Sequence, residues 1–310
     1  MKTMIPFLCS LSGAAICLWQ APACAAPSLA VSQGEESALP VLYDSTDLIQ
    51  GLIATELPGD KGWHPAVVNA EDKLPAFTDG AGILASGLTG LLNDFPGAGF
   101  PAKRIQYALA APADIGEIRV FTGNNGRDGR VFHTYTVRFS SDGGQTFTEP
   151  VYVQSHPSGT LNTPQINNWR VVLSQLTDTA GPLALQATHV EFDFYSVDNT
   201  GGQMRDPFDG LNPFTGTDDG LTAAFVSPLV WEIDVLAATR PPALSAVRVG
   251  NNLALSWVGP AQGAAIQSTA SLSPPDWQDL NPQPAITSDG TTNTALVLIE
   301  SGQGYFRLRF

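Results

Sequence analysis

Apolar and polar residues alternate along several short segments in the middle of the chain. In the segment 132–139, Tyr135, Val137 and Phe139 fall on one face, and polar side chains lie between them. A period of two is typical of a β-strand with one buried face. Similar runs occupy 115–121, 150–154, 188–194 and 230–236. Because loops rich in Gly, Asn and Asp join these runs, the pattern predicts an all-β sandwich or jelly roll.

Two of these runs also have acidic residues at alternate positions. Glu191 and Asp193 lie in the first, and Glu232 and Asp234 lie in the second. The residues between them are apolar, so we expect the apolar face to be buried. The four carboxylates should then face solvent or a site. Trp231 and Trp257 lie in strand patterns and are expected in the core.

The pattern is interrupted after residue 238, where Pro241 and Pro242 exclude a regular strand. We therefore expect one domain over 37–238, a Pro-rich linker over 239–245 and a second module over 246–310. That module has further short β patterns at 252–257, 264–271, 294–300 and 305–310. A core this small is typical of an immunoglobulin-like or fibronectin-like module.

The N-terminus has the layout of a secretory signal peptide. Lys2 precedes an apolar stretch over 4–19, and small residues follow up to Ala25. This layout predicts cleavage after Ala25 and a signal peptide over 1–25. Lipidation of Cys24 is the alternative. The mature protein is therefore expected outside the cell, at the cell surface or in the periplasm.

Composition excludes several classes of site and partner. The three cysteines, Cys9, Cys17 and Cys24, all lie in the expected signal peptide. The mature chain would then have no disulfide, no cysteine nucleophile and no cysteine-ligated zinc. A formal net charge of −14 disfavours nucleic acid as a partner. No later apolar run approaches the roughly 20 residues of a membrane-spanning helix.

The segment FSSDGGQTFTEP (139–150) has the spacing of an Asp-box, a motif of sialidases and other secreted proteins. A sialidase propeller would repeat the motif in each blade, and this chain has one copy. An Asp before two glycines also suits a tight turn, where its carboxylate accepts main-chain N–H groups. We therefore interpret the segment as a hairpin turn with Asp142 as the acceptor and Phe147 packed below it.

Three segments together resemble the discoidin or coagulation-factor type C domain, which is a galactose-binding-like jelly roll. They are PAFTDGAG (75–82), IGEIRVF with FHTYTVRFSSDGGQTF (115–147), and VWEIDVLA (230–237). Family members usually continue the first segment to a Thr and a Trp, where this chain has GILASG. The residues after 243 look like the fibronectin-like modules of exported bacterial proteins, which implies a spacer or attachment role.

The resemblance also implies a structural calcium ion. In sugar-binding discoidin-like domains, calcium commonly ties the early Asp-Gly loop to the Glu at the start of the last strand. The matching residues here are Asp79 and Glu232. Calcium takes roughly six to eight oxygen ligands, many of them main-chain carbonyls. The alternative is that Asp79 is a turn residue and Glu232 an exposed strand carboxylate.

Sugar recognition uses flat aromatic faces together with planar polar groups. The candidates in predicted loops are Trp63, His64, Arg127, Arg130 and Trp169. For each loop Trp, packing within the fold is the alternative. A long loop over 198–220 has five aspartates without the spacing of an EF-hand, and we expect its Phe208 and Phe214 to cap the sandwich.

These observations favour a non-catalytic protein that recognises an extracellular glycan or cell-surface matrix. One alternative is a structural or adhesive exoprotein without a sugar site. Another is a glycan hydrolase of the sialidase type. The sequence contains no Gly-x-Ser-x-Gly, His-Glu-x-x-His or phosphate-loop motif, which disfavours the enzyme classes that use them.

Overall fold

The computed structural model describes residues 27–34, 43–124, 130–159, 171–179, 181–197, 204–238, 244–258, 261, 263–289, 292–298 and 305–309. The expected signal peptide, Arg127, Trp169 and positions 239–243 of the expected linker lie outside these residues. The chain divides into two compact units, the first ending at Ala238 and the second beginning at Thr239. The described residues form β-strands and a single short 3-10 helix, so the all-β prediction is confirmed.

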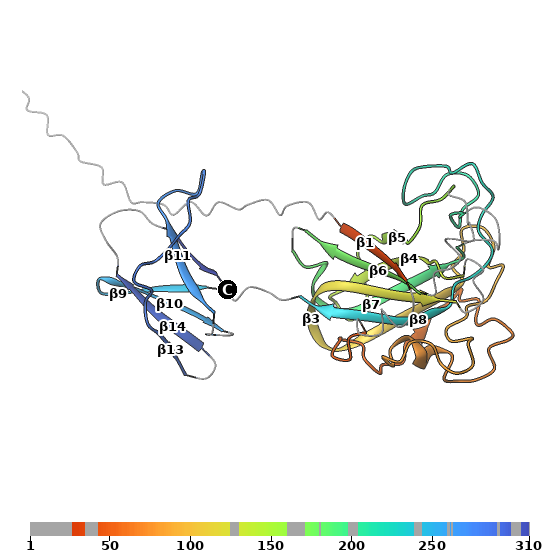
Figure 1. Ribbon diagram of the computed structural model, residues 1–310, viewed down its shortest axis with the longest axis horizontal. Coiled ribbons are helices and arrows are strands. Elements are labelled where there is room, and N and C mark those ends of the chain that lie inside the picture. Colours follow the sequence, from red (N-terminus) through yellow and green to blue (C-terminus); the bar gives the residue numbers. More distant parts are fainter. Residues whose placement is uncertain are drawn as a thin grey trace, which may run out of the picture. The chain divides into compact units, whose positions relative to one another are not determined.

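The first unit contains one folded sheet (Figure 1). Its elements are β1 (Pro27–Gly34), β2 (Thr55–Glu56), the 3-10 helix η3 (Leu74–Phe77), β3 (Lys103–Gly123), β4 (Thr134–Ser140), β5 (Val151–Gln154), β6 (Val171–Asp178), β7 (Ala184–Tyr195) and β8 (Val230–Ala237). The strand order is β1-β6-β3-β7-β4-β5, and β2 and β8 also pair with β3. None of the described residues belongs to a helix long and apolar enough to span a membrane.

The long strand β3 belongs to both layers of the sandwich. Its first part pairs with β7, beginning with Lys103 opposite Phe194, and its second part pairs with β6 and β8. Between them the register with β7 shifts, at Ala108, Ala113 and Ile115. Such irregularities bend a strand and let a sheet turn a corner. The sheet therefore folds over on itself into a jelly-roll-like β-sandwich.

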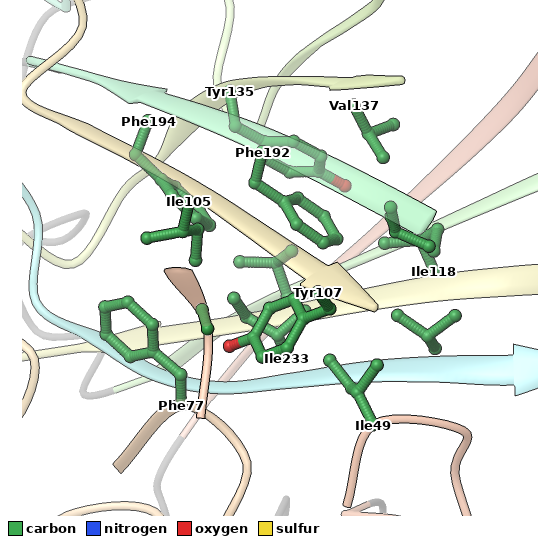
Figure 2. Packing of buried hydrophobic residues seen from close by; sticks show 14 of the residues in the cluster. Ile49, Phe77, Ile105, Tyr107, Ile118, Tyr135, Val137, Phe192, Phe194 and Ile233 are labelled. Carbon is green, nitrogen blue, oxygen red and sulfur yellow. The ribbon is translucent and has the colours of Figure 1, made fainter. Parts of the chain in front are cut away.

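The main hydrophobic core fills the space between the two layers. Tyr107 and Phe192 from one layer pack in the same cluster as Ile118 and Ile233 from the other (Figure 2). The apolar face predicted for 132–139 is the one that joins this core, through Tyr135, Val137 and Phe139. The alternation thus identified the core-facing side chains of this strand correctly, but its polar face is buried too, through Thr134 and Thr136.

Strand β1 lies before residue 37, where we expected the domain to begin. It pairs antiparallel with β6 from Pro27 opposite Asp178 to Gly34 opposite Val171. Most of its side chains are exposed, Leu29 and Val31 included. An exposed edge strand leaves little hydrophobic alternation in the sequence, which explains why the pattern did not reveal it.

The second unit is a small sandwich of two sheets. Its strands are β9 (Ser245–Val249), β10 (Asn252–Val258), β11 (Ala265–Thr269), β12 (Gln278–Asp279), β13 (Ile286–Ser288), β14 (Thr292–Leu298) and β15 (Tyr305–Arg309). One sheet has the order β13-β14-β10-β9 and the other β12-β11-β15. Trp257, Leu255 and Ile266 are buried between them, as expected for an immunoglobulin-like or fibronectin-like module.

Candidate functional site

The structure brings the early Asp-Gly loop and the last strand of the first unit together. The main-chain N–H of Gly80 donates to Oε2 of Glu232 at 2.8 Å. Glu232 is completely buried, whereas Asp79 is exposed at the tip of the turn. The alternative in which Glu232 is an exposed strand carboxylate is therefore wrong. A register irregularity in the β3–β8 pairing, between Phe121 and Thr122, lies beside Glu232.

The turn over 78–82, here called the Asp79–Gly80 turn, is held by its own neighbours. The carbonyl of Thr78 accepts the N–H of Gly51 at 2.7 Å and Nε2 of Gln50 at 2.8 Å. Oδ1 of Asp79 accepts the N–H of Ala81 at 2.7 Å. Gly80 has φ +68°, a conformation that a residue with a Cβ rarely adopts. Glycine at this position therefore allows the turn to present its N–H to Glu232.

Two further aspartates lie at the same edge of β8. Oδ2 of Asp234 accepts the N–H of Asp44 at 3.2 Å. Oδ1 of Asp47 accepts the N–H of Ile49 at 2.8 Å and that of Val235 at 3.3 Å. The segment 44–49 therefore covers β8 next to the Asp79–Gly80 turn. The sequence analysis missed Asp47, because its segment has no strand pattern and its partners lie far away along the chain.

Asp47, Glu232 and Asp234, here called the buried carboxylate cluster, each have one oxygen without a hydrogen bond. These atoms are Oδ2 of Asp47, Oε1 of Glu232 and Oδ1 of Asp234, and Oε1 of Gln50 is in the same condition. Buried polar atoms in proteins are nearly always paired, so an unpaired group requires an explanation. The Tyr107 hydroxyl is also buried without a partner, and its burial, together with the charges of Glu232 and Asp47, raises its pKa. The unpaired oxygens of the cluster still outnumber this donor, and carboxylate and amide oxygens are ligands that suit a cation.

Burial also raises the pKa values of the three carboxyl groups of the cluster. Burial, followed by the negative charge of Asp234, raises the pKa of Glu232 to about 9. Burial, followed by the charge of Asp47, raises the pKa of Asp234 to about 7, and burial raises the pKa of Asp47 to about 6. Each carboxyl group is therefore easier to protonate in the folded protein than in water. A bound cation would compensate the same charges without a proton.

The carboxylates of β7 provide an internal comparison. Glu191 and Asp193 are also buried, but arginines neutralise them. Nε of Arg104 donates to Asp193 at 2.8 Å, and Arg138 forms an ion pair with Glu191. All four strand carboxylates were expected to face solvent or a site. On β7 they form buried ion pairs, whereas on β8 Glu232 has only acidic groups among the charges that shift its pKa.

The resemblance implies a calcium ion here, and the unpaired oxygens are of the type that calcium takes as ligands. Among the described residues, no three His, Cys, Asp or Glu side chains lie close enough together to form a metal site by themselves. Calcium sites, however, draw many ligands from main-chain carbonyls and side-chain amides. Glu232 and Asp79 would hold the ion, and the free Oε1 of Gln50 and the carbonyls of the turn are oxygen ligands of the type that calcium prefers.

Trp63 has several packing contacts within the fold. Its Nε1 donates to Oε1 of Glu56 at 3.0 Å, and its ring lies 5.5 Å from that of Phe77. Nζ of the buried Lys103 lies 4.2 Å from the centre of the Trp63 ring. The ring is half-buried. These contacts give Trp63 a role in anchoring its loop to the core.

His64 and Arg130 meet at Asp94, a residue that the sequence analysis did not select. Both terminal nitrogens of Arg130 donate to the Asp94 carboxylate, at 2.8 and 2.9 Å. Nε2 of His64 lies 3.7 Å from Oδ2 of Asp94. Burial raises the pKa of Asp94, but the hydrogen bonds from Arg130 and Ser227 and the charge of Arg130 together outweigh it, so the net pKa lies below the usual range. Asp94 also accepts the N–H of Ser227 at 2.9 Å, so it joins three segments of the loop region.

The Asp-box segment is a turn between the antiparallel strands β4 and β5, as predicted. Oδ1 of Asp142 accepts the N–H groups of Gln145 and Thr146, each at 3.0 Å. The Thr146 hydroxyl donates to Oδ2 at 2.6 Å, and this bond holds the pKa of Asp142 well below its usual range. Asp142 is thus the internal acceptor of the turn.

The described part of the long acidic loop, 204–220, uses its polar groups internally. Oδ2 of the buried Asp206 accepts Nδ2 of Asn212 at 3.0 Å, and Oδ1 accepts the N–H of Phe208 at 2.8 Å. Phe214 stacks on Tyr152 with ring centres 5.2 Å apart and contacts Phe208 edge-on at 5.7 Å. These rings form an aromatic cap at the end of the sandwich, as the sequence predicts.

No protein-family model matches the sequence, and no curated protein matches it. The fold is that of an all-β protein with two sandwich modules. Its distinguishing feature is a cluster of buried carboxylates under an Asp-Gly turn.

Proposed function

We propose that the first unit is a non-catalytic carbohydrate-recognition domain of an exported protein, stabilised by calcium. The observation that supports this most directly is the buried Glu232 carboxylate under the Asp79–Gly80 turn, with Oε1 free of hydrogen bonds. This arrangement of an early Asp-Gly turn and a last-strand Glu is what the resemblance to sugar-binding discoidin-like domains implies. Fold-level analogy thus links the site to the proposed function.

Calcium would supply the positive charge that the buried carboxylate cluster lacks. Glu232 and Asp79 would be its side-chain ligands, and the neutral Gln50 would add an amide oxygen. Gln50 and Gly51 already bind the carbonyl of Thr78, so an ion here would connect the segment 47–51, the turn and β8. We expect the loops of the domain to become stiffer as a result.

The positions of the carboxylates support a non-catalytic role. Glycoside hydrolases generally place two carboxyl groups on either side of an accessible sugar bond. Here the groups with the most strongly raised pKa values, Glu232 and Asp234, are completely buried and face main-chain N–H groups. A polysaccharide cannot reach them without unfolding the segments that cover them.

The loops of the first unit provide a surface for a ligand. The segments 93–100 and 204–225 come together at one end of the sandwich (Figure 1). Phe95 donates its N–H to the carbonyl of Phe225 at 2.9 Å, and Gly99 donates to that of Pro207 at 2.7 Å. Binding residues are often found on loops that a rigid β-scaffold positions in this way.

A glycan array tests the proposal, using the purified chain without residues 1–25 and a buffer that contains calcium. We expect concentration-dependent retention on a subset of glycans, with no release of reducing sugar. Retention on no glycan would contradict carbohydrate recognition and favour a structural or adhesive role. Release of reducing sugar would favour a hydrolase instead.

The proposed export has its own test. N-terminal sequencing of the protein recovered from outside the cytoplasm should begin at Ala26 if the expected signal peptide is removed. A mature chain that begins with a lipidated Cys24 would favour membrane anchoring.

A further inference from the structure

Phe95 has an unusual backbone conformation. Its φ is +56°, and the residue is 73% exposed. A bulky residue with positive φ is a steric outlier, and such strain costs roughly 1–3 kcal/mol. Burial of Phe95 offsets little of this cost, because most of the residue is exposed. Strain of this kind is concentrated at functional sites, which makes Phe95 a candidate ligand contact.

Neighbouring residues hold Phe95 in this conformation. Its N–H binds the carbonyl of Phe225 at 2.9 Å, and the preceding Asp94 is fixed by Arg130 and Ser227. The Phe95 ring stacks on that of Phe225, with centres 5.2 Å apart and planes 9° apart. One face of the ring is therefore covered, and the exposed area belongs to the opposite face and the edges.

A shallow hollow of about 350 Å³ adjoins this ring. Its lining includes Phe95, Gly97, Ala98, Asp209, Thr222 and Ala223. We call it the Phe95 hollow. The small residues leave room beside the ring, and the volume is at the lower end of the range for small-molecule sites. The hollow is large enough to hold a single sugar ring.

Two polar groups line the hollow: the exposed carboxylate of Asp209 and the hydroxyl of Thr222, which accepts from Arg205 at 2.5 Å. Asp209 is the charged one of the two. Its Oδ1 accepts the N–H of Ala223 at 2.7 Å, which fixes the side chain. A carboxylate accepts hydrogen bonds and donates none, so it suits the hydroxyl groups of a ligand. Together with the net charge of −14, it disfavours a phosphate or an acidic lipid headgroup. Burial of this carboxylate under a purely apolar partner would also be costly.

We infer that the Phe95 hollow is the sugar-binding subsite, in which the apolar face of a neutral pyranose ring stacks on Phe95 and its hydroxyl groups donate to Asp209. This inference rests on the proposed function and identifies the surface that performs it. The ligand class is a neutral hexose or N-acetylhexosamine residue of a glycan. Uronic and sialic acids are disfavoured, because their carboxylates would be repelled by Asp209.

The test uses an array of immobilised neutral, uronic and sialylated glycans, together with four variants. In Phe95→Gly, the ring is lost and the strained conformation becomes favourable, so we expect an unchanged or higher Tm and at least a tenfold loss of binding. Phe95→Tyr should retain binding, and Asp209→Asn should weaken it. Phe100→Ala is the matched control, because Phe100 is 60% exposed on the same turn but does not line the hollow.

The outcomes separate the inference from the proposed function. Wild-type binding to neutral glycans that Phe95→Gly retains at full strength would overturn the subsite and leave carbohydrate recognition in place. Preferential binding to uronic or sialylated glycans would overturn the assigned ligand class. Wild-type retention on no glycan would overturn both proposals. A lower Tm in Phe95→Gly with unchanged binding would show that the ring has only a packing role.

Discussion

Oε2 of Glu232 accepts the main-chain N–H of Gly80 at 2.8 Å, and this hydrogen bond joins residues 152 positions apart. The neighbouring bond from the N–H of Asp44 to Asp234 spans 190 positions. Both carboxylates thus bind the segments that cover β8 through main-chain N–H groups, and each retains one free oxygen. We propose that calcium binds at Glu232, beside these segments.

Substitution of Glu232 by Gln should remove the charge of the side chain and keep its hydrogen bond with Gly80. The amide oxygen can still accept from Gly80, while the buried negative charge is lost. In EDTA at pH 8 we expect an equal or higher Tm than in the wild type, since position 232 no longer has a buried carboxyl group that must be neutralised by a proton. The calcium response should disappear. At 100 times its Kd, a ligand adds about 2.7 kcal/mol to the free energy of unfolding.

Glu191→Gln is the matched control for this experiment. Glu191 is a buried strand carboxylate that Arg104 and Arg138 neutralise. Its loss should lower the Tm, because it leaves buried arginine charge uncompensated. It should leave the calcium response unchanged. Thermal unfolding followed by circular dichroism measures both quantities, and a full calcium response in Glu232→Gln would contradict the assignment of Glu232.

The buried carboxylate cluster also predicts a pH dependence. The pKa of Glu232 is about 9 and that of Asp234 about 7 in the folded protein, well above their ordinary values. At any pH between the ordinary and the raised pKa of such a group, the folded state binds more protons than the unfolded state. The stability that the raised pKa values provide is therefore complete below about pH 4 and is lost as the pH rises towards 9.

Urea unfolding in EDTA at pH 6.5, 7.5 and 8.5 measures this effect. We expect the free energy of unfolding to fall by on the order of 1 kcal/mol per pH unit for each group that titrates. The range begins at the ordinary pKa of histidine, 6.5, and extends upward. The buried His133, whose pKa burial lowers to about 3, has the opposite effect on stability and acts mainly at more acidic pH. A free energy that rises over this range would be inconsistent with the prediction.

The ion pair of Asp94 and Arg130 should stabilise the loop region. Its side chains are mostly buried, with exposed fractions of 14% and 17%. Asp94→Asn would leave the guanidinium of Arg130 without its charge partner, and we expect a loss of about 2–4 kcal/mol. Chemical denaturation measures this loss. Because Asp94 precedes Phe95, weaker glycan binding should accompany it, and an unchanged stability would show that the pair contributes little.

The Asp142 turn should matter for stability and not for binding. Asp142→Ala removes the acceptor of the N–H groups of Gln145 and Thr146 and of the Thr146 hydroxyl. We expect the Tm to fall by a few degrees, because the turn between β4 and β5 loses its internal hydrogen bonds. Retention on glycans should be unchanged at temperatures well below the Tm. Weaker glycan binding at an unchanged Tm would instead assign Asp142 to a ligand site.

Local sequence patterns predicted the strands because a half-buried strand imposes a period of two on its own residues. The core positions Tyr135 and Phe192 were identified in this way. The surroundings of Glu232 could not be derived from such a pattern, because they depend on where the segments 44–49 and 78–82 pack. The resemblance to discoidin-like domains was needed to pair Glu232 with the Asp-Gly turn.

The residues that the sequence analysis missed share a physical cause. Asp47 and Asp94 lie in loops, and long-range partners such as Val235 and Ser227 define their roles. Phe95 is distinguished by its φ angle and its stacking on Phe225, neither of which leaves a periodic signal. The Pro and Gly residues that follow Phe95 indicate a turn but not the orientation of the ring.

Thermal unfolding of the intact mature chain with and without calcium tests the central claim most directly. At pH 7.5, we predict that EDTA lowers the Tm and that millimolar calcium restores and raises it, with a smaller effect of magnesium. Calcium binding to the folded state alone would produce this shift. A Tm that neither chelator nor added calcium changes would contradict the claim that a calcium ion holds the Asp79–Gly80 turn against Glu232.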